Sequence, residues 1–403
     1  MNETLTAAQS AADNKIKDWF YGSERPYFVL AGYAGTGKTS LLIHTVTETL
    51  ELVAGESAAF VTPTGKAATV LIRSGVPATT LHKLIYQSIV EKHEIEVNGK
   101  KITIEKLSFR RRESVDKQIK LIVLDEASMV SDETVADLLE FGVKVLICGD
   151  NAQLPPVEGA GSYLKQPDIT LTEIVRQQRD NPIIRLSEIA REGGYVPYGN
   201  YGTAAVVNGR YLTGERRRRA LLSADQIICG VNKTRVQIND EVRAYKKLYG
   251  PPRTGDKLIC TQNNWETFID GELRFNLVNG IIGYAYDPFY DDSTGIGFMQ
   301  FKADFLEEFC PEALPFDAGI FTDGYYRYKR GDYFERFNEE GEPVGAFTLN
   351  RFEYGYCVSC HKAQGSEFGS VTVFDESYAF REDRARWLYT AITRARKKLL
   401  IVR

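Results

Sequence analysis

The segment Gly32-Tyr33-Ala34-Gly35-Thr36-Gly37-Lys38-Thr39 decides how the rest of this chain is interpreted. It fits the pattern G-x-x-x-x-G-K-[S/T] and lies between an apolar run, Tyr27 to Ala31, and a helical pattern that starts near Ser40. Glycines in such a loop let backbone N–H groups turn inward around phosphate oxygens, and a helix N-terminus favours negative charge. The segment therefore predicts a phosphate-binding loop between a buried strand and a helix.

The polar residues around this loop have separate expected roles. Lys38 is expected to reach the β- and γ-phosphates of a nucleotide, and Thr39 to bind Mg²⁺. Asp125 and Glu126 directly follow another apolar run, Leu121 to Leu124. A carboxylate at the end of a parallel strand can hold Mg²⁺, and its neighbour can orient or deprotonate a water molecule. Together these residues predict Mg²⁺-dependent hydrolysis of a nucleoside triphosphate, without indicating what the hydrolysis drives.

The composition fits a globular protein of about two to three domains, at roughly 150 residues each. The formal net charge is −4, which does not exclude nucleic-acid binding, because a basic channel can lie on an acidic molecule. No apolar run approaches the ~20 residues of a membrane helix, and no signal peptide is visible. A single C-x-x-C pair, Cys357 and Cys360, predicts neither a disulfide framework nor a four-thiolate zinc site. We expect a reducing, cytoplasmic compartment.

Short apolar runs alternate with helical patterns in the first third of the chain, which is typical of an α/β domain with a parallel sheet. The expected strands are Tyr27 to Ala31, Ala58 to Val61, Lys120 to Leu124 and Val143 to Cys148, and the expected helices are Ser40 to Leu52 and Gly65 to Ile72. A second α/β region is expected to begin near Leu171. Its expected strands are Gln226 to Cys229, Val371 to Phe374 and Leu399 to Val402.

Two segments interrupt the α/β pattern. Apolar and polar residues alternate on both sides of Asn98-Gly99, which is the strongest short signal for a β-hairpin. The basic run Arg110 to Arg112 after it either faces a phosphate backbone or is simply solvated. Between about Gly255 and Asn350 the helical pattern disappears and Tyr, Phe, Gly and Asp dominate, which indicates a small β-rich insertion.

Two later motifs supply further phosphate contacts. Gly149 to Val157 follows the expected strand that ends at Cys148, and Gln153 within it is a neutral amide that could sense a γ-phosphate. Leu388 to Arg396 lies near the C-terminus, and Arg394 could reach phosphate across a cleft. An arginine in that position stabilises transition-state charge and can raise turnover by ~10³ or more.

The complete set of motifs resembles the superfamily 1B helicases, the RecD-like group, and within it the Dda-like phage members. In family order, the matching segments are Leu5 to Gln9 (Q motif), Gly32 to Thr39 (motif I), Thr62 to Ala68 (Ia), Thr79 to His82 (Ib), Asp125 to Met129 (II), Gly149 to Val157 (III), Leu171 to Gln177 (IV), His361 to Phe368 (V) and Tyr389 to Arg396 (VI). The resemblance implies an α/β fold of two RecA-like P-loop NTPase domains. It also implies a β-hairpin insertion in the first domain and an SH3-like β-barrel insertion in the second.

The implied domain boundaries are 1–88 and 119–170 for RecA-like domain 1A, 89–118 for the hairpin 1B, 171–255 and 351–403 for RecA-like domain 2A, and 256–350 for the SH3-like insertion 2B. The implied cofactors are ATP and Mg²⁺, with Thr39 and Asp125 as metal ligands. The implied catalytic residues are Lys38, Asp125, Glu126, Gln153, Arg176 and Arg394. Glu126 would be the base, Arg176 a γ-phosphate sensor and Arg394 the arginine finger. The implied nucleotide-binding residues are Gln9, Gly32, Ala34, Gly35, Thr36, Gly37, Lys38, Thr39, Ser40, Glu367 and Arg394, with Gln9 reading adenine and Glu367 meeting the ribose.

A motor that moves along any sequence is expected to hold the DNA backbone rather than base edges. The family pattern assigns this contact to Thr62, Pro63, Thr64, His82, Asn232, His361, Lys362 and Ser366. Phe109 or Trp265 could stack on bases, although core packing is the commoner fate of an aromatic side chain. The run Arg216 to Arg219 matches no motif and is either a DNA-facing patch or a solvated helix.

The resemblance implies an ATP-dependent DNA helicase that moves 5′→3′ along single-stranded DNA and separates duplexes. We expect a monomer that binds single-stranded and fork DNA but no membrane, with single-stranded-DNA-binding or replication proteins as candidate partners. One alternative is a DNA-dependent ATPase that remodels protein–DNA complexes without processive unwinding. A non-enzymatic accessory protein with a decayed ATP site is disfavoured, because the phosphate loop and carboxylates are intact. A GTPase switch is disfavoured because no guanine-reading segment is evident.

Overall fold

The computed structural model describes residues 5–97, 100–156, 161–175, 180–271, 275–291, 293–329, 332–337 and 343–403. The chain divides into two compact units. The first comprises Met1–Tyr86, Arg111–Arg235 and Val358–Arg403, and the second comprises Gln87–Arg110 and Val236–Cys357. Among the helices that the structure describes, none has the length and apolar character needed to span a bilayer.

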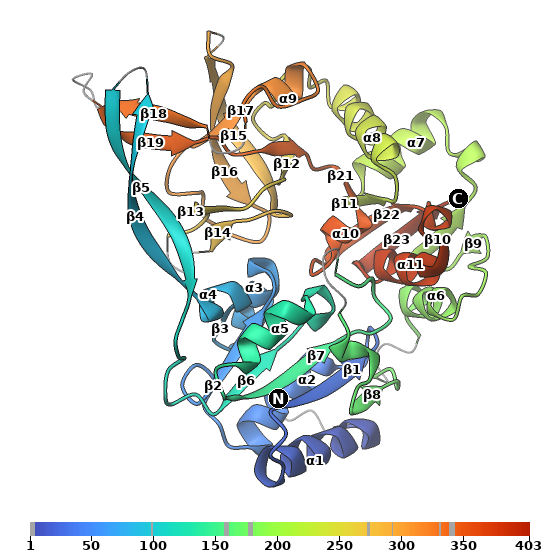
Figure 1. Ribbon diagram of the computed structural model, residues 1–403. Helices are drawn as coiled ribbons and strands as arrows, with labels where there is room; N and C mark the ends of the chain where they lie inside the picture. Colours follow the sequence, from blue (N-terminus) through green and yellow to red (C-terminus); the bar gives the residue numbers. More distant parts are fainter. Residues whose placement is uncertain are drawn as a thin grey trace. The chain divides into compact units, whose positions relative to one another are not determined.

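The first unit contains a six-stranded parallel sheet in the order β3-β2-β6-β7-β1-β8 (Figure 1). Its strands are β1 (Tyr27–Gly32), β2 (Ala58–Thr62), β3 (Ala78–Thr80), β6 (Leu121–Leu124), β7 (Lys144–Gly149) and β8 (Ile169–Leu171). The four strands predicted from apolar runs are confirmed, and each lies within two residues of its expected bounds. The sheet extends to Leu171, because β8 pairs with β1 at the point where the second region was expected to begin.

Both faces of this sheet are buried, which explains why its strands are continuous apolar runs. On β1, the side chain of Leu30 joins one core cluster and that of Val29 joins the other. The first cluster takes residues from α1 (Ala7–Gly22) and α2 (Lys38–His44), and the second takes residues from α4 (Leu81–Ile85) and α5 (Asp132–Leu139). The sheet is thus a rigid platform whose strand ends carry the loops of the candidate site.

The helix expected from Ser40 to Leu52 is shorter than predicted. After α2 the chain forms one turn of π-helix, Thr45–Thr49. The hydroxyls of Thr45 and Thr49 both donate to the buried carboxylate of Asp13 on α1, at 2.5 and 2.7 Å. The wider turn satisfies this carboxylate, which a local helical pattern does not reveal. The helix α3 (Gly65–Arg73) agrees with its prediction.

The first unit also contains a second six-stranded sheet, in the order β21-β11-β22-β23-β10-β9. Its strands are β9 (Gly199–Asn200), β10 (Ala204–Val207), β11 (Gln226–Cys229), β21 (Cys357–Ser359), β22 (Phe368–Phe374) and β23 (Ala395–Val402). The pairs β11–β22, β22–β23 and β10–β23 are parallel. The helices of this region are α6 (Pro182–Arg191), α7 (Gly214–Leu222), α10 (Cys360–Ala363) and α11 (Arg384–Ile392), and α11 packs against α6 and α10. A further helix, α8 (Asn232–Tyr245), begins in this unit, and its residues from Val236 onward belong to the second. The three strands predicted here correspond to β11, β22 and β23.

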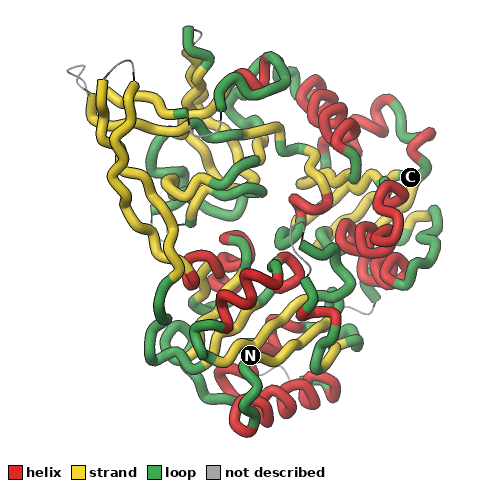
Figure 2. The backbone as a smooth tube through the Cα atoms, in the orientation of Figure 1, coloured by secondary structure: helices red, strands yellow, loops and turns green. Residues whose placement is uncertain are grey.

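Strands and loops make up nearly all of the second unit (Figure 2). An antiparallel five-stranded sheet runs in the order β17-β16-β15-β12-β20. Its strands are β12 (Lys257–Cys260), β15 (Ile282–Asp291), β16 (Ile296–Ala303), β17 (Leu314–Asp317) and β20 (Phe352–Tyr354). Smaller pairs are β13 (Asn264–Phe268) with β14 (Asn276–Leu277) and β18 (Tyr333–Phe337) with β19 (Pro343–Thr348), and α9 (Gly319–Thr322) is a single turn. The segment after Gly255 is therefore β-rich, as its composition indicated.

The expected hairpin region forms a separate two-stranded sheet. β4 (Tyr86–Val97) pairs with β5 (Lys100–Arg111), and the dipeptide Asn98-Gly99 between them lies outside the described residues. At the end of β5, Arg111 forms ion pairs with Glu140 and Asp137. This arginine of the basic run is therefore neutralised by acidic side chains of its own unit.

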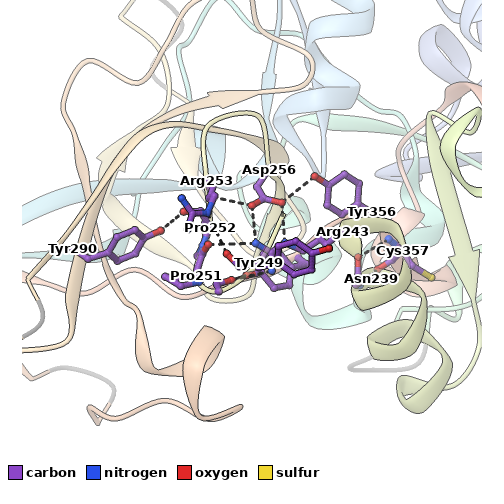
Figure 3. A network of polar contacts seen from close by, with 12 residues as sticks. Asn239, Arg243, Tyr249, Pro251, Pro252, Arg253, Asp256, Tyr290, Tyr356 and Cys357 are labelled. Atoms are coloured by element: carbon purple, nitrogen blue, oxygen red, sulfur yellow. Dashed lines mark hydrogen bonds and ion pairs between the residues drawn. The ribbon is translucent and has the colours of Figure 1, made fainter. Parts of the chain in front are cut away.

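A buried ion pair joins α8 to the five-stranded sheet within the second unit (Figure 3). Arg243 donates from Nε to Asp256 Oδ1 and from Nη2 to Asp256 Oδ2, both at 3.1 Å. The same carboxylate accepts the Tyr356 hydroxyl at 3.0 Å and the Arg253 backbone N–H at 2.8 Å. The two charged side chains are 8% and 0% exposed. Because every oxygen of Asp256 is engaged, this network holds the C-terminal part of α8 on the sheet.

All six cysteines of the chain are buried, and none of them forms a disulfide. Three lie in the second six-stranded sheet and its connections, namely Cys229 in β11, Cys357 in β21 and Cys360 at the start of α10. Burial raises the pKa of the Cys360 thiol, so it remains protonated and behaves as a small apolar side chain.

Candidate nucleotide and nucleic-acid site

The predicted phosphate loop connects β1 to α2. Gly35 and Gly37 have φ angles of 79° and 74°, in the left-handed region that favours glycine. A Cβ atom at Gly37 would lie 2.6 Å from Gln9 Nε2 and 3.2 Å from Val175 Cγ2. The loop therefore requires glycine at Gly37 for both its backbone conformation and its close packing.

Lys38 and Thr39 begin α2 and point to opposite parts of the site. The Lys38 ammonium donates to the loop carbonyls of Gly32 and Tyr33, at 2.8 and 3.2 Å. Thr39 Oγ1 donates to Asp125 Oδ2 at 3.2 Å, so the two predicted metal ligands are in contact. Burial disfavours the charge on Lys38, but nearby acidic groups, Asp150 foremost, outweigh it and raise the pKa of this amine. Lys38 is therefore a permanent cation at the loop.

Asp125 and Glu126 directly follow the last residue of β6. Asp125 is buried, and burial raises its pKa, although the backbone N–H of Glu126 donates to its Oδ1 at 2.8 Å. Burial and the charge on Asp125 together raise the pKa of Glu126 to about 7. Glu126 has φ 56°, a conformation that non-glycine residues seldom adopt and that often occurs at functional sites. A carboxylate with a pKa near neutrality suits a general base.

These residues fit a nucleoside triphosphate with a bound Mg²⁺. No group of three or more His, Cys, Asp and Glu side chains arranged to hold a metal occurs among the described residues. Mg²⁺ is commonly held by one or two carboxylates together with substrate phosphates and water. The pair Thr39 and Asp125, beside the phosphate loop and the Lys38 cation, supplies that donor set.

Gln153 follows β7 of the first sheet, and Arg394 directly precedes β23 of the second. The Gln153 side chain is 7% exposed, and its Nε2 lies 3.4 Å from Asp150 Oδ2. Its buried Oε1 has no hydrogen-bond partner among the residues that the structure describes. Arg394 is 4% exposed and donates to the carbonyls of Thr390 and Ser366 and to Thr393 Oγ1. The charges of Arg394 and Lys38 both act on Glu126 and favour its ionised form. The structure thus places the side chains of Lys38 and Arg394 near enough to Glu126 for their charges to act on its carboxylate.

The loops of the first sheet contact the helices of the second. Leu154 N–H donates to Thr390 Oγ1 at 2.9 Å, and Gln364 Nε2 donates to the Leu154 carbonyl at 2.7 Å. The Tyr389 hydroxyl donates to Asp150 Oδ2 at 2.6 Å. Sequence reasoning did not single out Tyr389 or Asp150, although both lie inside motifs that it quoted. Their partners are far apart in the chain, so spacing alone carried no signal for the contact.

The Gln9 side chain forms two hydrogen bonds to backbone groups of the protein. Its Oε1 accepts the Thr6 backbone N–H at 2.9 Å in a capping box at the start of α1, and its Nε2 donates to the Thr36 carbonyl at 3.1 Å. The side chain that was expected to read adenine therefore supports the phosphate loop in this structure. Glu367 is exposed and forms a 3.6 Å ion pair with Arg396. Ser40 is exposed on α2.

The predicted γ-phosphate sensor Arg176 lies outside the described residues. The side chain of Phe109, a candidate for base stacking, also lies outside what the structure describes. Pro63 is half-buried between the two threonines of motif Ia, and Trp265 is half-buried in β13. In the basic run on α7, Arg217 lies over the ring of Phe374 and Arg218 pairs with Glu215. Two of the four arginines on α7 therefore contact residues of the same unit.

The predicted backbone-binding residues of motifs Ia and V lie side by side. Thr62 is 1% exposed and its hydroxyl donates to the Thr64 carbonyl at 2.9 Å, while Thr64 Oγ1 caps α3 by accepting the Ala67 N–H. A Cβ at Gly365 would lie 3.3 Å from Thr64 Oγ1 and 2.8 Å from Met129 Sδ. The two threonine hydroxyls are thus engaged internally, and Thr64 meets motif V directly.

The remaining candidates sit at helix starts. His82 on α4 is half-buried, and burial lowers its pKa to about 4, so its imidazole is neutral. His361 on α10 lies against the Phe380 ring, with ring centroids 5.8 Å apart, and burial lowers its pKa as well. Asn232 is exposed at the start of α8, and its Oδ1 accepts Arg235 Nε at 2.8 Å. Lys362 is half-buried next to His361, and the Ser366 carbonyl accepts a guanidinium N–H of Arg394.

Two family models match most of the first unit. Residues 4–201 match a model described as AAA domain, and residues 354–402 match one described as UvrD-like helicase C-terminal domain. The first match covers the phosphate loop and both carboxylates, and the second covers Arg394.

Individual relatives agree with these models. The chain is 27% identical, over 92% of its length, to a protein of Deinococcus radiodurans named ATP-dependent RecD2 DNA helicase, of which the match covers 46%. It is 26% identical, over 47% of its length, to the Candida albicans protein named ATP-dependent DNA helicase PIF1, of which 24% is covered. A solved structure of a Bacteroides Pif1 bound to single-stranded DNA is 17% identical, with a TM-score of 0.50, and covers 99% of this chain and 92% of that one. The chain spans less than half the length of the curated relatives it matches.

Proposed function

Because this chain belongs to the RecD/Pif1-like helicases of superfamily 1B and has their two RecA-like domains, we propose that it is an ATP-dependent DNA helicase. The observation that carries the proposal is the convergence on Glu126. Lys38 from the first sheet and Arg394 from the second both act on this carboxylate, while Thr39 and Asp125 are in contact beside it. A site made from two sheets can open and close, as a motor requires.

In the proposed reaction, Lys38 would exchange its loop carbonyls for the β- and γ-phosphates, and Thr39 and Asp125 would hold Mg²⁺. The bound ion would neutralise phosphate charge and act as a Lewis acid. Glu126 accepts the proton of the attacking water, which its raised pKa permits near neutral pH. Gln153, whose buried amide oxygen has no partner among the described residues, would sense the γ-phosphate. Arg394, with Arg176 as a second proposed cation, would stabilise charge at the γ-phosphate.

Movement follows if the two sheets differ in their grip on DNA between the closed and open states. Only a difference in affinity between those states can shift the equilibrium, however tight the binding is. We assign the backbone contacts to the exposed and half-buried candidates His82, Asn232, His361 and Lys362, with the backbone around Thr64 and Ser366. The neutral state of His82 suits a hydrogen-bond donor to phosphate rather than a charge.

The insertions have proposed roles as well. β4 and β5 would form the pin that splits the duplex at a fork, within segment 89–118. The β-rich segment 256–350 would be an SH3-like insertion. The antiparallel five-stranded sheet and the long paired strands support these roles.

The decisive experiment uses short duplexes that carry either a 5′ or a 3′ single-stranded tail, with ATP and Mg²⁺. We expect strand separation of the 5′-tailed substrate, and loss of this activity in the Lys38→Ala variant. Separation of only the 3′-tailed duplex would reverse the proposed direction. Translocation without separation of either duplex would replace the helicase by a remodelling ATPase, and absence of ATP hydrolysis with any DNA would overturn the proposed function.

A further inference from the structure

The hydroxyl of Tyr389 on α11 joins the two sheets at the phosphate loop. Tyr389 is 1% exposed. Its hydroxyl donates to Asp150 Oδ2 at 2.6 Å and accepts the backbone N–H of Ala34 at 2.8 Å. A phenol has one hydrogen to donate, so the contact with the carboxylate uses it fully. Burial, followed by the charge on Asp150, raises the pKa of Tyr389, so the hydroxyl stays protonated and keeps this donor role.

Both partners of this hydroxyl belong to the proposed phosphate site. Ala34 lies in the phosphate loop, where backbone N–H groups are the donors that a phosphate oxygen would take. The Asp150 carboxylate also accepts the Ala152 N–H at 3.0 Å and approaches Gln153 Nε2 at 3.4 Å, and its charge acts on Lys38. One side chain of the second sheet therefore touches a loop donor and the acid that orients the candidate γ-phosphate amide.

We propose that Tyr389 is a positioning residue that couples occupancy of the phosphate loop to the attachment of α11, because its hydroxyl and a phosphate oxygen compete for the Ala34 N–H. This inference rests on the proposed function. Arg394 follows just after α11 and is tied by its Nε to the Thr390 carbonyl, so a change at Tyr389 is passed to the arginine through one helical turn. The coupling needs no contact between Tyr389 and the reacting atoms.

Thr390→Val is the matched control for Tyr389→Phe. Thr390 adjoins Tyr389 on α11 and also makes a bond between the sheets, since its Oγ1 accepts the Leu154 N–H at 2.9 Å. Its replacement removes a hydrogen bond of similar length from the same helix without touching the phosphate loop. A general loosening of the two sheets would therefore affect both variants alike, whereas specific coupling would affect Tyr389→Phe alone.

The first measurement is amide hydrogen exchange of the full chain without nucleotide. We expect the Ala34 amide to exchange about tenfold faster in Tyr389→Phe than in the wild type, which is the size expected for loss of a hydrogen bond in a network that includes a charged group. In Thr390→Val, the Leu154 amide should respond instead. Unchanged exchange at Ala34 in Tyr389→Phe would overturn the inference. If Tyr389→Phe does not fold, Asp150→Asn weakens the bond that fixes the Tyr389 hydroxyl, and faster exchange at Ala34 is again expected because its acceptor is less well held.

The second measurement is the affinity for single-stranded DNA with ADP and with a non-hydrolysable ATP analogue. The ratio of the two affinities measures the coupling between the nucleotide and DNA sites. We expect this ratio to be about tenfold lower in Tyr389→Phe than in the wild type, or to reach one where the wild-type ratio is itself below ten. In Thr390→Val the ratio should stay at the wild-type value. A wild-type ratio of one would overturn the proposed function. A wild-type ratio well above one that Tyr389→Phe retains would overturn the coupling role alone.

Discussion

The Asp256→Asn substitution tests the buried network of the second unit. The Asp256 carboxylate accepts four hydrogen bonds, two from Arg243 and one each from Tyr356 and Arg253. Asparagine has the same shape but only one acceptor oxygen, and its amide nitrogen would face donors. At least two of the four bonds are lost, and the Arg243 guanidinium remains buried without its counter-charge.

The expected cost follows from these contacts. A hydrogen bond to a charged group contributes about 1.5–3 kcal/mol, so two lost bonds cost roughly 3–6 kcal/mol. Removing one partner of a buried ion pair costs about 3–5 kcal/mol, which agrees with that range. Both estimates depend on burial, and the side chains of Arg243 and Asp256 are 8% and 0% exposed.

Asp323→Asn is the matched control, because it removes the partner of Arg327 in an exposed ion pair whose side chains are about 40% exposed. That change should have little effect on the free energy of unfolding, because solvent screens an exposed ion pair. Urea unfolding, followed by hydrogen exchange in peptides that cover α8 and β12, would give the local free energy of opening for both variants. Equal losses in the two variants would refute the claim that the buried network stabilises this unit.

The other predictions concern the site and the pin. Lys38→Ala should lower ATP turnover by about a hundredfold or more, because it removes the cation that the phosphates meet, while thermal melting of the DNA-free protein stays near that of the wild type; retained turnover would contradict the role of the loop. Between about pH 6.5 and 4 the unfolded chain takes up a proton at His82 that the folded chain excludes, so the stability of the fold falls as the pH falls through this window. In the His82→Gln variant, the melting temperature should therefore depend less on pH in this window than in the wild type. Parallel curves of melting temperature against pH would argue against a neutral buried imidazole. Replacing residues 96–103 by a tight turn should spare DNA-stimulated ATP hydrolysis and reduce fork separation, and undiminished unwinding would reject the pin.

Much of the fold was predictable because its strongest signals are local. β1, β2, β6 and β7 are apolar runs flanked by turn residues, and a strand buried on both faces must have that composition. The short strands β3, β8, β9 and β10 escaped prediction because they contain two to four residues each and depend on pairing with distant partners. Their formation is a property of the sheet rather than of their own residues.

The candidate site divides in the same way. Lys38, Thr39 and Asp125 could be predicted because loop chemistry and strand ends restrict which residues can serve. Gln9 shows the limit of that reasoning, since the residues Thr6 to Gln9 form a capping box whose second role, a bond to the Thr36 carbonyl, depends on where the phosphate loop packs. Tyr389 could not be assigned for the same reason, because its partners Ala34 and Asp150 lie in two loops that follow separate strands, β1 and β7, of the other sheet.

The burial of every native cysteine makes this chain convenient for optical work. Maleimide dyes react with exposed thiolates, and the six thiols of the protein are shielded from solvent. Cysteines introduced at Tyr21 on α1 and at Tyr211 near β10, whose side chains are 64% and 76% exposed, would accept a donor and an acceptor fluorophore. Energy transfer between the two fluorophores would then follow opening and closing in single molecules, and none of the native cysteines would have to be removed first.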